Sequence, residues 1–379
     1  ANLHSIRLAA EVGRRFLEAR RIPKEGIDLG ILGLTNPQPG SFYGLPWATG
    51  LLGLERVPGP TVQQACATSA RALQMAAAEV ALGSADCALV VCADRMSNGP
   101  VLYYPDATAP GGNGVTERWT LDNFGRDPFA QNAMIDTAEK AAARLGIGLA
   151  ELNEVTLLRY AQYQAALADG RAFQRRYMVE APLFDSGFRR QSGALEADEG
   201  VFPTTAEGLA KLKPVKPGGT HSFGTQTHPA DGNAGMIVTT RELARELSAD
   251  AKIEVELLGF GQARVEKGFM PLAPAPAAQA ALARAGLSIR DVDAVKTHNP
   301  FAVNDIAFAR ATGFPLERMN NFGCSLVWGH PQGPTGLRSA IELIEELALR
   351  GGGVGLFTGC AAGDSAMALA LRVRDVGRG

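Results

Sequence analysis

The chain has 379 residues, a formal net charge of −2, 46% hydrophobic residues and 20% charged residues. This composition is typical of a soluble globular protein with room for about two or three domains. The near-neutral charge gives no electrostatic basis for binding nucleic acid or a membrane surface, and the longest apolar runs are far too short to cross a bilayer.

Helical and strand-like segments alternate through the first third of the chain. Residues Ala1–His4 show neither a basic region nor a long apolar core, so we expect no signal peptide. The alternation that follows predicts a mostly parallel sheet covered by helices. The expected helices are Ser5–Ala19, Pro46–Leu54 and Ala70–Leu82, and the expected strands are Ile27–Gly33, Gly59–Gln63 and Cys87–Cys92.

The middle of the chain breaks this rhythm. Residues 98–212 hold glycine-rich and aromatic loops, with helices expected near Ala133–Leu145 and Leu152–Leu167. An insertion at the C-terminal end of a strand is where substrate-covering loops are usually built. We therefore divide the chain into an N-terminal half at 1–97, a loop or insertion domain at 98–230 and a C-terminal half at 231–379.

The last third repeats the element order of the first. A strand, a helix, a glycine or serine turn, a second strand and a cysteine recur in the same sequence. This order predicts two βα-repeat halves packed as one pseudo-symmetric core. The repeated elements are a strand over Val292–Thr297, a helix over Leu337–Leu349 and a strand over Gly355–Thr358.

Cys66 stands in a run of small residues at the predicted turn before the Ala70–Leu82 helix. Backbone N–H groups and the helix dipole at such a turn favour a thiolate. A lone cysteine is nevertheless more often a small buried side chain. The nucleophile interpretation therefore depends on the other end of the chain.

Three further stretches fall at the predicted C-terminal ends of strands: Lys296–Phe301, Gly329–Gly336 and Gly359–Ser365. Residues beyond the strand ends of such a sheet share one crevice, so we expect their side chains to meet beside Cys66. A thiol beside a histidine makes a thiolate nucleophile, a second thiol can act as acid or base, and small residues leave N–H groups free to bind an oxyanion. The candidates are His298, His330 and Cys360.

The five cysteines are an odd number and are scattered widely. They form neither a disulfide framework nor a Cys-x-x-Cys pair for zinc, which fits reduced thiols in a cytoplasm. Cys87 and Cys92 lie in a predicted buried strand and are expected to be inert. Cys324 is expected to pack near the site, with a site-lining thiol as the alternative.

Four ordered stretches resemble the signature set of the thiolase superfamily. They are Cys66 in its small-residue turn, Gly329-His330-Pro331 with its following glycines, Cys360 before Ala-Ala-Gly, and the His298-Asn299-x-Phe301 motif. Met134–Glu139 resembles the family's loop-domain helix, and Glu207–Leu212 resembles the segment leading to the coenzyme A (CoA) site. The histidine in the last motif is similar to the sterol-carrier-type and aromatic-degradation branches. The resemblance implies a five-layered αβαβα core of two pseudo-symmetric βαβ repeat halves with an inserted loop domain.

The resemblance also implies roles for these residues. Cys66 would be acylated, His330 would deprotonate it, and Cys360 would move the proton on or off the α-carbon. One oxyanion hole would use the backbone N–H groups of Cys66 and Ala362. The second would pair His330 with His298, which stands where most members have an asparagine. Asn299, in place of an acidic residue, is counted with this second hole.

The resemblance places five residues along the substrate and CoA: Met134, Thr227, His228, Phe301 and Gly363. Ala133 stands where many short-chain thiolases carry a histidine, which argues against an acetoacetyl specialist. Members with the His298 substitution often handle longer, substituted or aromatic 3-oxoacyl-CoAs, such as benzoylsuccinyl-CoA. The family's first strand, with its Arg-Thr-Pro-like turn, is not found before Ala1, so it is either trimmed or lost.

The implied reaction is cleavage of a 3-oxoacyl-CoA by CoA, or the reverse Claisen condensation, through an acyl-Cys66 intermediate. CoA is a substrate, and no metal or permanently bound cofactor is implied. The implied partners are a second copy of the chain and, in some members, a small zinc-ribbon/OB-fold subunit. Three alternatives stay open: a non-catalytic acyl-CoA or lipid carrier on the same fold, a ketoacyl synthase, and a cysteine hydrolase. The carrier would need none of the reactive side chains, and the synthase lacks the second cysteine.

Overall fold

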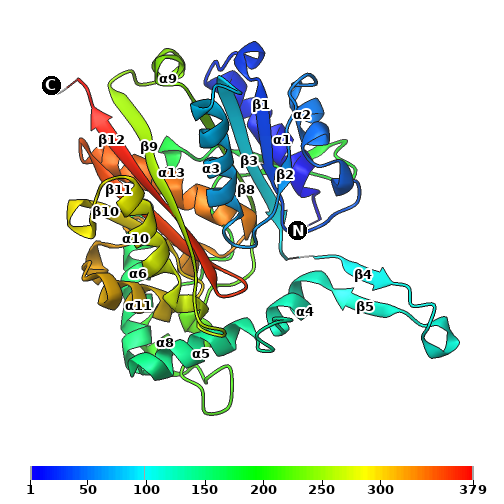
Figure 1. Cartoon of the computed structure of the whole chain (residues 1–379), viewed down its shortest axis with the longest axis vertical. Helices are drawn as coiled ribbons and strands as arrows, with labels where there is room; N and C mark the ends of the chain where they lie inside the picture. Colours follow the sequence, from blue (N-terminus) through cyan, green and yellow to red (C-terminus); the bar gives the residue numbers. More distant parts are fainter. Residues whose placement is uncertain (1, 98, 378–379) are drawn as a thin grey trace.

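Two four-stranded sheets form the centre of the molecule, one from each half of the chain (Figure 1). They are seen in a computed structural model that describes residues 2–97 and 99–377. The predicted domain limits at residues 1, 98 and 379 lie outside the described residues. None of the described helices combines the length and the hydrophobicity needed to span a bilayer.

The first sheet has the strand order β2-β1-β3-β8. β1 runs parallel to β2 and β3, whereas β8 runs antiparallel to β3. β1 and β3 read as nearly continuous apolar runs because helices cover both faces of the sheet. The strands span Leu29–Gly33 (β1), Thr61–Val62 (β2), Cys87–Arg95 (β3) and Asp231–Thr239 (β8).

The second sheet has the order β10-β11-β12-β9. β10 and β11 are parallel, and β12 is antiparallel to both of its neighbours. β1, β3 and β8 therefore pair as β10, β11 and β12 do, which confirms the two pseudo-symmetric halves. The strands span Ile253–Arg264 (β9), Ala294–His298 (β10), Gly352–Ala361 (β11) and Ser365–Asp375 (β12).

The prediction of a mostly parallel sheet is confirmed for the first sheet, where two of the three strand pairings are parallel, whereas two of the three pairings in the second sheet are antiparallel. Alternating strands and helices identify parallel βαβ units but do not reveal how the last strand of each half pairs. Residues 362–364 alone join β11 to β12. A connection that short can form only a hairpin, so β12 must return antiparallel.

Helices fill three layers around the sheets and complete the predicted five-layered αβαβα core (Figure 1). α3 and α13 lie between the sheets and contact both, α1 and α2 cover the outer face of the first sheet, and α10 covers that of the second. Alanine and glycine on α3 and α13 let the two helices pack closely in this middle layer. The helices span Ser5–Ala19 (α1), Leu45–Leu52 (α2), Thr68–Ala81 (α3), Pro274–Arg284 (α10), Ala302–Thr312 (α11), Ser325–Trp328 (α12) and Gly333–Leu349 (α13).

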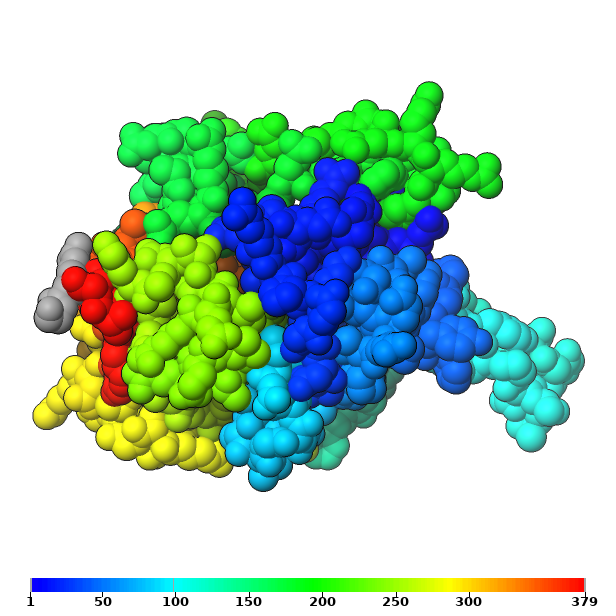
Figure 2. Space-filling model, turned by 90° about the horizontal axis from the view of Figure 1, so that it is seen from above, coloured from blue at the N-terminus to red at the C-terminus, as the bar shows by residue number. Residues whose placement is uncertain are grey.

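The segment between β3 and β8 is the predicted insertion. Its β4–β5 hairpin projects away from the body, as Figures 1 and 2 show, whereas α5 and α6 pack against α11 below the second sheet. Its strands are Val101–Tyr104 (β4), Val115–Arg118 (β5), Ala181–Phe184 (β6) and Gln191–Leu195 (β7). Its helices are Trp119–Gly125 (α4), Met134–Leu145 (α5), Leu149–Ala166 (α6), Ala168–Arg171 (α7) and Ala206–Ala210 (α8), and α9 (Arg241–Leu247) follows β8.

The predicted start of the C-terminal half at residue 231 is wrong. β8 begins there, but it pairs with β3 over its whole length, from Arg95↔Asp231 to Cys87↔Thr239. The first sheet therefore ends at Thr239, because its last strand arrives only after the insertion. Pairing over such a sequence distance leaves no local pattern from which the boundary could be read.

β8 is an edge strand, whereas its counterpart β12 lies between β11 and β9. A groove of about 870 Å³ runs beside β8. Its walls are mainly apolar side chains of α1, α13 and β9, among them Val12, Phe16 and Ile341. Among the described residues, the two halves therefore also differ at this edge of the first sheet.

Candidate active site

Cys66 lies on a tight turn between β2 and α3, as the sequence predicts. The turn is closed through Thr68, whose hydroxyl accepts from the Gln64 N–H at 2.9 Å and donates to the Ala65 carbonyl at 2.7 Å. Ala65 adopts a left-handed conformation with φ of 44°. A non-glycine residue in this region is strained, and such strain gathers at functional sites. The turn thereby presents the Cys66 thiol toward the second half.

His330 lies in the loop between α12 and α13. The preceding Gly329 has φ of 91°, and a Cβ there would lie 2.8 Å from both the Ala230 Cβ and the His228 Nε2. The His330 N–H donates to the His228 carbonyl at 2.8 Å. The chain can therefore approach residues 228–230 closely only because position 329 is glycine.

Cys66 and His330 form a nucleophile–base pair across the two halves. The Cys66 Sγ lies 3.1 Å from the His330 Nε2, and the other ring nitrogen of His330 lies 2.7 Å from the Thr335 Oγ1. A thiol, an imidazole and a group that orients the imidazole are the arrangement that activates a cysteine nucleophile. The structure thus brings together two residues that lie 264 positions apart in the sequence.

The resting pair is neutral, contrary to the expectation that the helix N-terminus favours a thiolate. Burial raises the pKa of Cys66 to about 12, and the N–H groups of Ala362 and Cys66 offset this only in part. Burial likewise lowers the pKa of His330 to about 3. The thiol proton must therefore pass to His330 during attack on the substrate rather than before it.

His298 ends β10 and stacks on His330, with ring centroids 4.0 Å apart and planes inclined by 28°. Its Nδ1 lies 2.9 Å from the Ser325 Oγ. Its Nε2 is buried and has no hydrogen-bond partner among the described residues. Burial, and then the neighbouring His330, hold the pKa of His298 well below its usual range. A buried nitrogen without a partner beside the nucleophile is a binding position for a substrate atom.

Cys360 lies near the end of β11 and is fully buried. Burial, and then the nearby Cys66, raise the pKa of Cys360 well above its usual range. The Asn304 amide donates to the Cys360 Sγ at 3.3 Å. Ala362 follows at the turn and directs its N–H at the Cys66 thiol. The second thiol and the first predicted oxyanion donors therefore meet the nucleophile.

Asn299 does not point into the site, so its predicted place in an oxyanion hole is wrong. Its amide nitrogen donates to the Asp305 carboxylate at 2.7 Å and to the Cys324 Sγ at 3.2 Å. Its amide oxygen accepts from Ser325 and from the Leu326 N–H, both at 3.1 Å. Both amide hydrogens are thus used to hold neighbouring segments together.

The five predicted substrate residues divide into two groups. Met134, Gly363, Thr227 and His228 lie at a helix start, in a turn or in a strand-like segment, whereas Phe301 lies in the core. Met134 at the start of α5 is half-buried, and Gly363 lies in the β11–β12 turn, where its carbonyl accepts from Arg264 at 3.1 Å. Phe301 is buried in the core and packs edge-on against the His221 ring. Thr227 and His228 lie in the strand-like segment between residues 300–301 and 329–330, and the Thr227 hydroxyl donates to the Ser325 carbonyl at 2.5 Å. Phe301 therefore packs behind the site and does not line it.

Asp94, which the sequence reasoning missed, fastens the site from the end of β3. Its carboxylate accepts from the backbone N–H groups of Thr35 and Asn36, from the Thr35 hydroxyl and from the Gly333 N–H, each at 2.9 Å. Burial raises its pKa to about 7. The signal in the sequence that could have identified Asp94 was its position as a single carboxylate at the end of the apolar Cys87–Ala93 run. Asn304, one helical turn beyond the His298 motif, was also missed.

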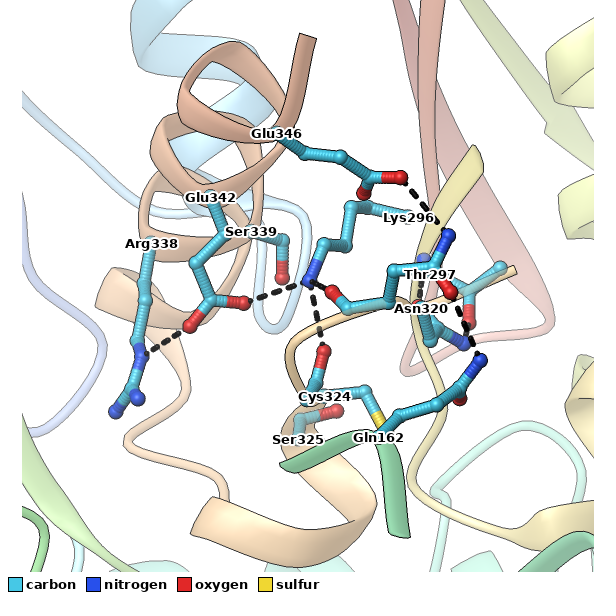
Figure 3. Close-up of polar contacts among 12 residues, drawn as sticks. Gln162, Lys296, Thr297, Asn320, Cys324, Ser325, Arg338, Ser339, Glu342 and Glu346 are labelled. Carbon is cyan, nitrogen blue, oxygen red and sulfur yellow. Dashed lines mark hydrogen bonds and ion pairs between the residues drawn. The ribbon is translucent and has the colours of Figure 1, made fainter. Parts of the chain in front are cut away.

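A buried network of charges lies beside the loop that carries Cys324 and Ser325 (Figure 3). The Lys296 amine donates to the Gly323 carbonyl at 2.9 Å and to the Glu342 carboxylate at 3.0 Å. Glu342 in turn accepts from Arg338 at 3.0 Å. Ionic hydrogen bonds of this kind fix the loop, and with it the Ser325 hydroxyl that contacts His298.

Comparisons with known proteins agree with this site. The thiolase N-terminal domain model matches residues 1–242, and the thiolase C-terminal domain model matches residues 251–373. The peroxisomal 3-ketoacyl-CoA thiolase A of Mus musculus is 31% identical over 78% of this chain and 68% of its own length. The acetyl-CoA acetyltransferase of Chromobacterium violaceum is 28% identical over 98% and 94%. The beta-ketoadipyl-CoA thiolase of Pseudomonas knackmussii is 30% identical over 84% and 80%.

Solved structures show the same fold. The acetyl-CoA acetyltransferase of Bacillus anthracis superposes with a TM-score of 0.88 at 25% identity, over 97% of this chain and 93% of that one. The human mitochondrial 3-ketoacyl-CoA thiolase superposes with a TM-score of 0.88 at 23% identity, over 98% and 93%. Both domain models, the relatives and the folds agree on one assignment. The chain therefore belongs to the thiolase family of acyltransferases.

Proposed function

We propose that this protein transfers an acyl group between a 3-oxoacyl-CoA and CoA through an acyl-Cys66 intermediate. The observation that carries the proposal is the 3.1 Å contact between the Cys66 Sγ and the His330 Nε2, with a second thiol and two N–H groups directed at the same point. A carrier on this fold would need none of these groups. The intact set therefore favours the enzyme over the non-catalytic acyl-CoA or lipid carrier.

In the proposed cleavage, Cys66 gives its proton to His330 as its sulfur attacks the 3-oxo carbon. The bond between the α-carbon and that carbon breaks, and its electron pair forms the enolate of the departing acyl-CoA. Cys360 protonates the α-carbon and then takes the proton of an incoming CoA thiol. The CoA sulfur attacks the acyl-Cys66 thioester, and Cys66 leaves as a thiolate that recovers its proton from His330.

Two sets of donors would stabilise the negative oxygens of this reaction. The N–H groups of Cys66 and Ala362 face the thiol, where the oxygen of the tetrahedral intermediate forms. His298 serves the enolate oxygen when its Nε2 carries the proton, which requires the Ser325 hydroxyl to turn from the Asn299 oxygen and donate to the His298 Nδ1. One such fixed donor can contribute about 3–4 kcal/mol to transition-state stabilisation.

For the acyl group we propose a longer, substituted or aromatic chain, with benzoylsuccinyl-CoA as one example. The support is local: small Ala133 caps α5, and flexible Met134 follows it beside the buried cluster that contains Cys360. Methionine adapts its shape to irregular apolar groups. A relative named beta-ketoadipyl-CoA thiolase, 30% identical, is consistent with a substituted acyl group.

Intact-protein mass after mixing with acyl-CoAs and 3-oxoacyl-CoAs tests the proposal. We expect an acyl adduct on the wild type and on Cys87→Ser, a matched control that removes a buried thiol from β3, but none on Cys66→Ala. The acyl groups that load define the specificity. Tight reversible binding of acyl-CoA without any adduct would refute acyl transfer and establish the carrier.

A homodimer core and a cytoplasmic location are further proposals, which rest on family resemblance and on the reduced cysteines. The small zinc-ribbon/OB-fold subunit is proposed from the resemblance alone. Size determination of the purified protein, alone and after co-expression with such a subunit, tests these assemblies.

A further inference from the structure

Three potential metal ligands converge at the nucleophile. The Cys66 Sγ and one ring nitrogen from each of His298 and His330 lie within 4.8 Å of one another. Zinc binds cysteine at about 2.3 Å and histidine at about 2.1 Å in tetrahedral sites, so its ligand atoms lie about 3.4–3.6 Å apart. Side-chain shifts of about 1 Å would bring the three atoms to that spacing.

The groups behind both histidines match the surroundings of metal ligands. The His330 Nδ1 lies 2.7 Å from the Thr335 Oγ1, and the His298 Nδ1 lies 2.9 Å from the Ser325 Oγ. Ligating histidines usually give their second N–H to such an oxygen, which leaves the other nitrogen free for the metal. The His298 Nε2 is free in this sense, because it is buried without a partner among the described residues.

We propose that Cys66, His298 and His330 bind a zinc-like divalent cation that holds the enzyme in a reversible inactive state. The ion replaces the Cys66 proton, which leaves to solvent, so that one Zn²⁺ and one thiol give one zinc thiolate and one H⁺. Three protein ligands leave the fourth position open to water or a substrate thiol. The ion occupies the sulfur lone pair and the His330 nitrogen that acyl transfer needs, so loading of Cys66 stops.

The proposed zinc binding does not depend on the proposed function. Only the proposed inhibition depends on it, because inhibition requires that the protein transfers acyl groups. Zinc binds the deprotonated thiol and neutral imidazoles, so zinc affinity should rise with pH as the Cys66 proton becomes easier to displace. Calorimetry in buffers with different ionisation enthalpies should accordingly report about one proton released per zinc.

The experiment uses the purified full chain with Zn²⁺ and with Co²⁺ as a spectroscopic probe. We expect one cobalt per chain with a thiolate-to-cobalt charge-transfer band, and zinc should slow iodoacetamide alkylation of Cys66 at least tenfold until EDTA is added. His298→Asn, which removes one ligand, should weaken zinc binding at least ~100-fold, since loss of an outer-shell partner alone costs 10–100-fold. His4→Asn removes a histidine far from the site in the sequence and should bind zinc as the wild type does.

Cys66→Ser gives a second variant in case His298→Asn folds poorly, and it should abolish the charge-transfer band. Equal zinc affinity in Cys66→Ser or His298→Asn and in the wild type would overturn the proposal, as would alkylation that zinc leaves unchanged. Acyl-adduct formation in metal-free buffer is measured separately. A failed zinc site and a failed acyltransferase are therefore distinguishable.

Discussion

Burial controls the protonation of the reactive side chains at the scale of single residues. The Cys66 thiol and the His330 imidazole touch, yet each is held in its neutral form because burial disfavours its charged form. Such a site avoids nonspecific thiolate chemistry while it is empty. A substrate carbonyl that takes up the negative charge is then required for the proton to move, since the N–H groups of Cys66 and Ala362 can stabilise the charge on its oxygen.

The pH dependence of Cys66 alkylation follows from this burial. Because the pKa of Cys66 is raised to about 12, the thiolate fraction of the free enzyme should grow about tenfold per pH unit from pH 7 to 10. Iodoacetamide labelling of Cys66, followed by peptide mass spectrometry, measures the rate. A plateau near pH 7 would show instead that the thiol is already ionised there.

Gly329→Ala should damage catalysis through the backbone. The new Cβ would meet Ala230 and His228 at 2.8 Å in a conformation with φ of 91°, so His330 must shift. We expect about 100-fold slower acyl loading, as a displacement of about 1 Å can cause, and a loss of about 1–3 kcal/mol in stability. Gly50→Ala is the control, since its Cβ meets nothing within 4 Å. Equal loading rates in the two variants would contradict this account.

At the scale of elements, Asp94 links three segments that converge on the site. It joins the end of β3 to residues 35–36 and to the first N–H of α13. The helix that follows His330 is therefore positioned by a carboxylate from the first sheet. Any change in the charge of Asp94 should therefore affect the hydrogen bonds that join the two halves.

The stability contributed by Asp94 should fall as the pH rises from about 4 to about 7. Its pKa is about 7 in the folded protein, against 3.8 for an ordinary aspartate, so the folded state binds more protons than the unfolded state within that window. Urea unfolding of the wild type and of Asp94→Asn should show a difference in free energy that shifts against the wild type by up to ~4 kcal/mol across this range, with no further change above it. A constant difference would mean that Asp94 ionises normally.

The sequence predicts the elements of this fold better than their pairing. Apolar runs and helical spacing locate β1, β3, α3 and α13 within a few residues, because these signals are local. The antiparallel placement of β8 depends on a partner more than 130 residues away, as the Arg95↔Asp231 pair shows. No local pattern encodes it.

The candidate site likewise contains features that the sequence predicts and features that it does not. Cys66, His330 and Cys360 could be named because residue type, spacing and family resemblance coincide at those positions. The orientation of the Asn299 side chain, which points away from the site, could not be predicted. It is determined by Asp305 and Cys324, and these residues contact Asn299 only in the folded core. Hydrogen-bond direction is decided by packing that a linear pattern does not contain.

At the scale of the whole molecule, we propose the β4–β5 hairpin as a contact for the second copy of the proposed homodimer. Val101, Tyr103 and Val115 on this projecting hairpin are 65%, 58% and 62% exposed (Figure 2). Val101 and Tyr103 share one face of the hairpin and Val115 lies on the other, and exposed apolar side chains on a protruding element are typical of an interaction site. Such a contact would leave the catalytic groups of each copy untouched.

Replacement of Val101, Tyr103 and Val115 by serine should lower the molar mass in light scattering while the acyl-adduct yield stays within about twofold, because the hairpin lies outside the core layers. Phe202→Ser, which changes another exposed aromatic residue, serves as the control. An unchanged mass in the triple variant would exclude the hairpin from the assembly.

The groove beside β8 has a practical consequence for anyone who handles this protein. A sheet edge next to apolar walls is a template on which any extended, hydrophobic peptide can add a strand. An extended apolar segment paired with β8 would complete this sheet as β9 completes the second. A short synthetic strand that occupies the groove would act as a formulation additive, raising the melting temperature and extending shelf life without touching the chemistry.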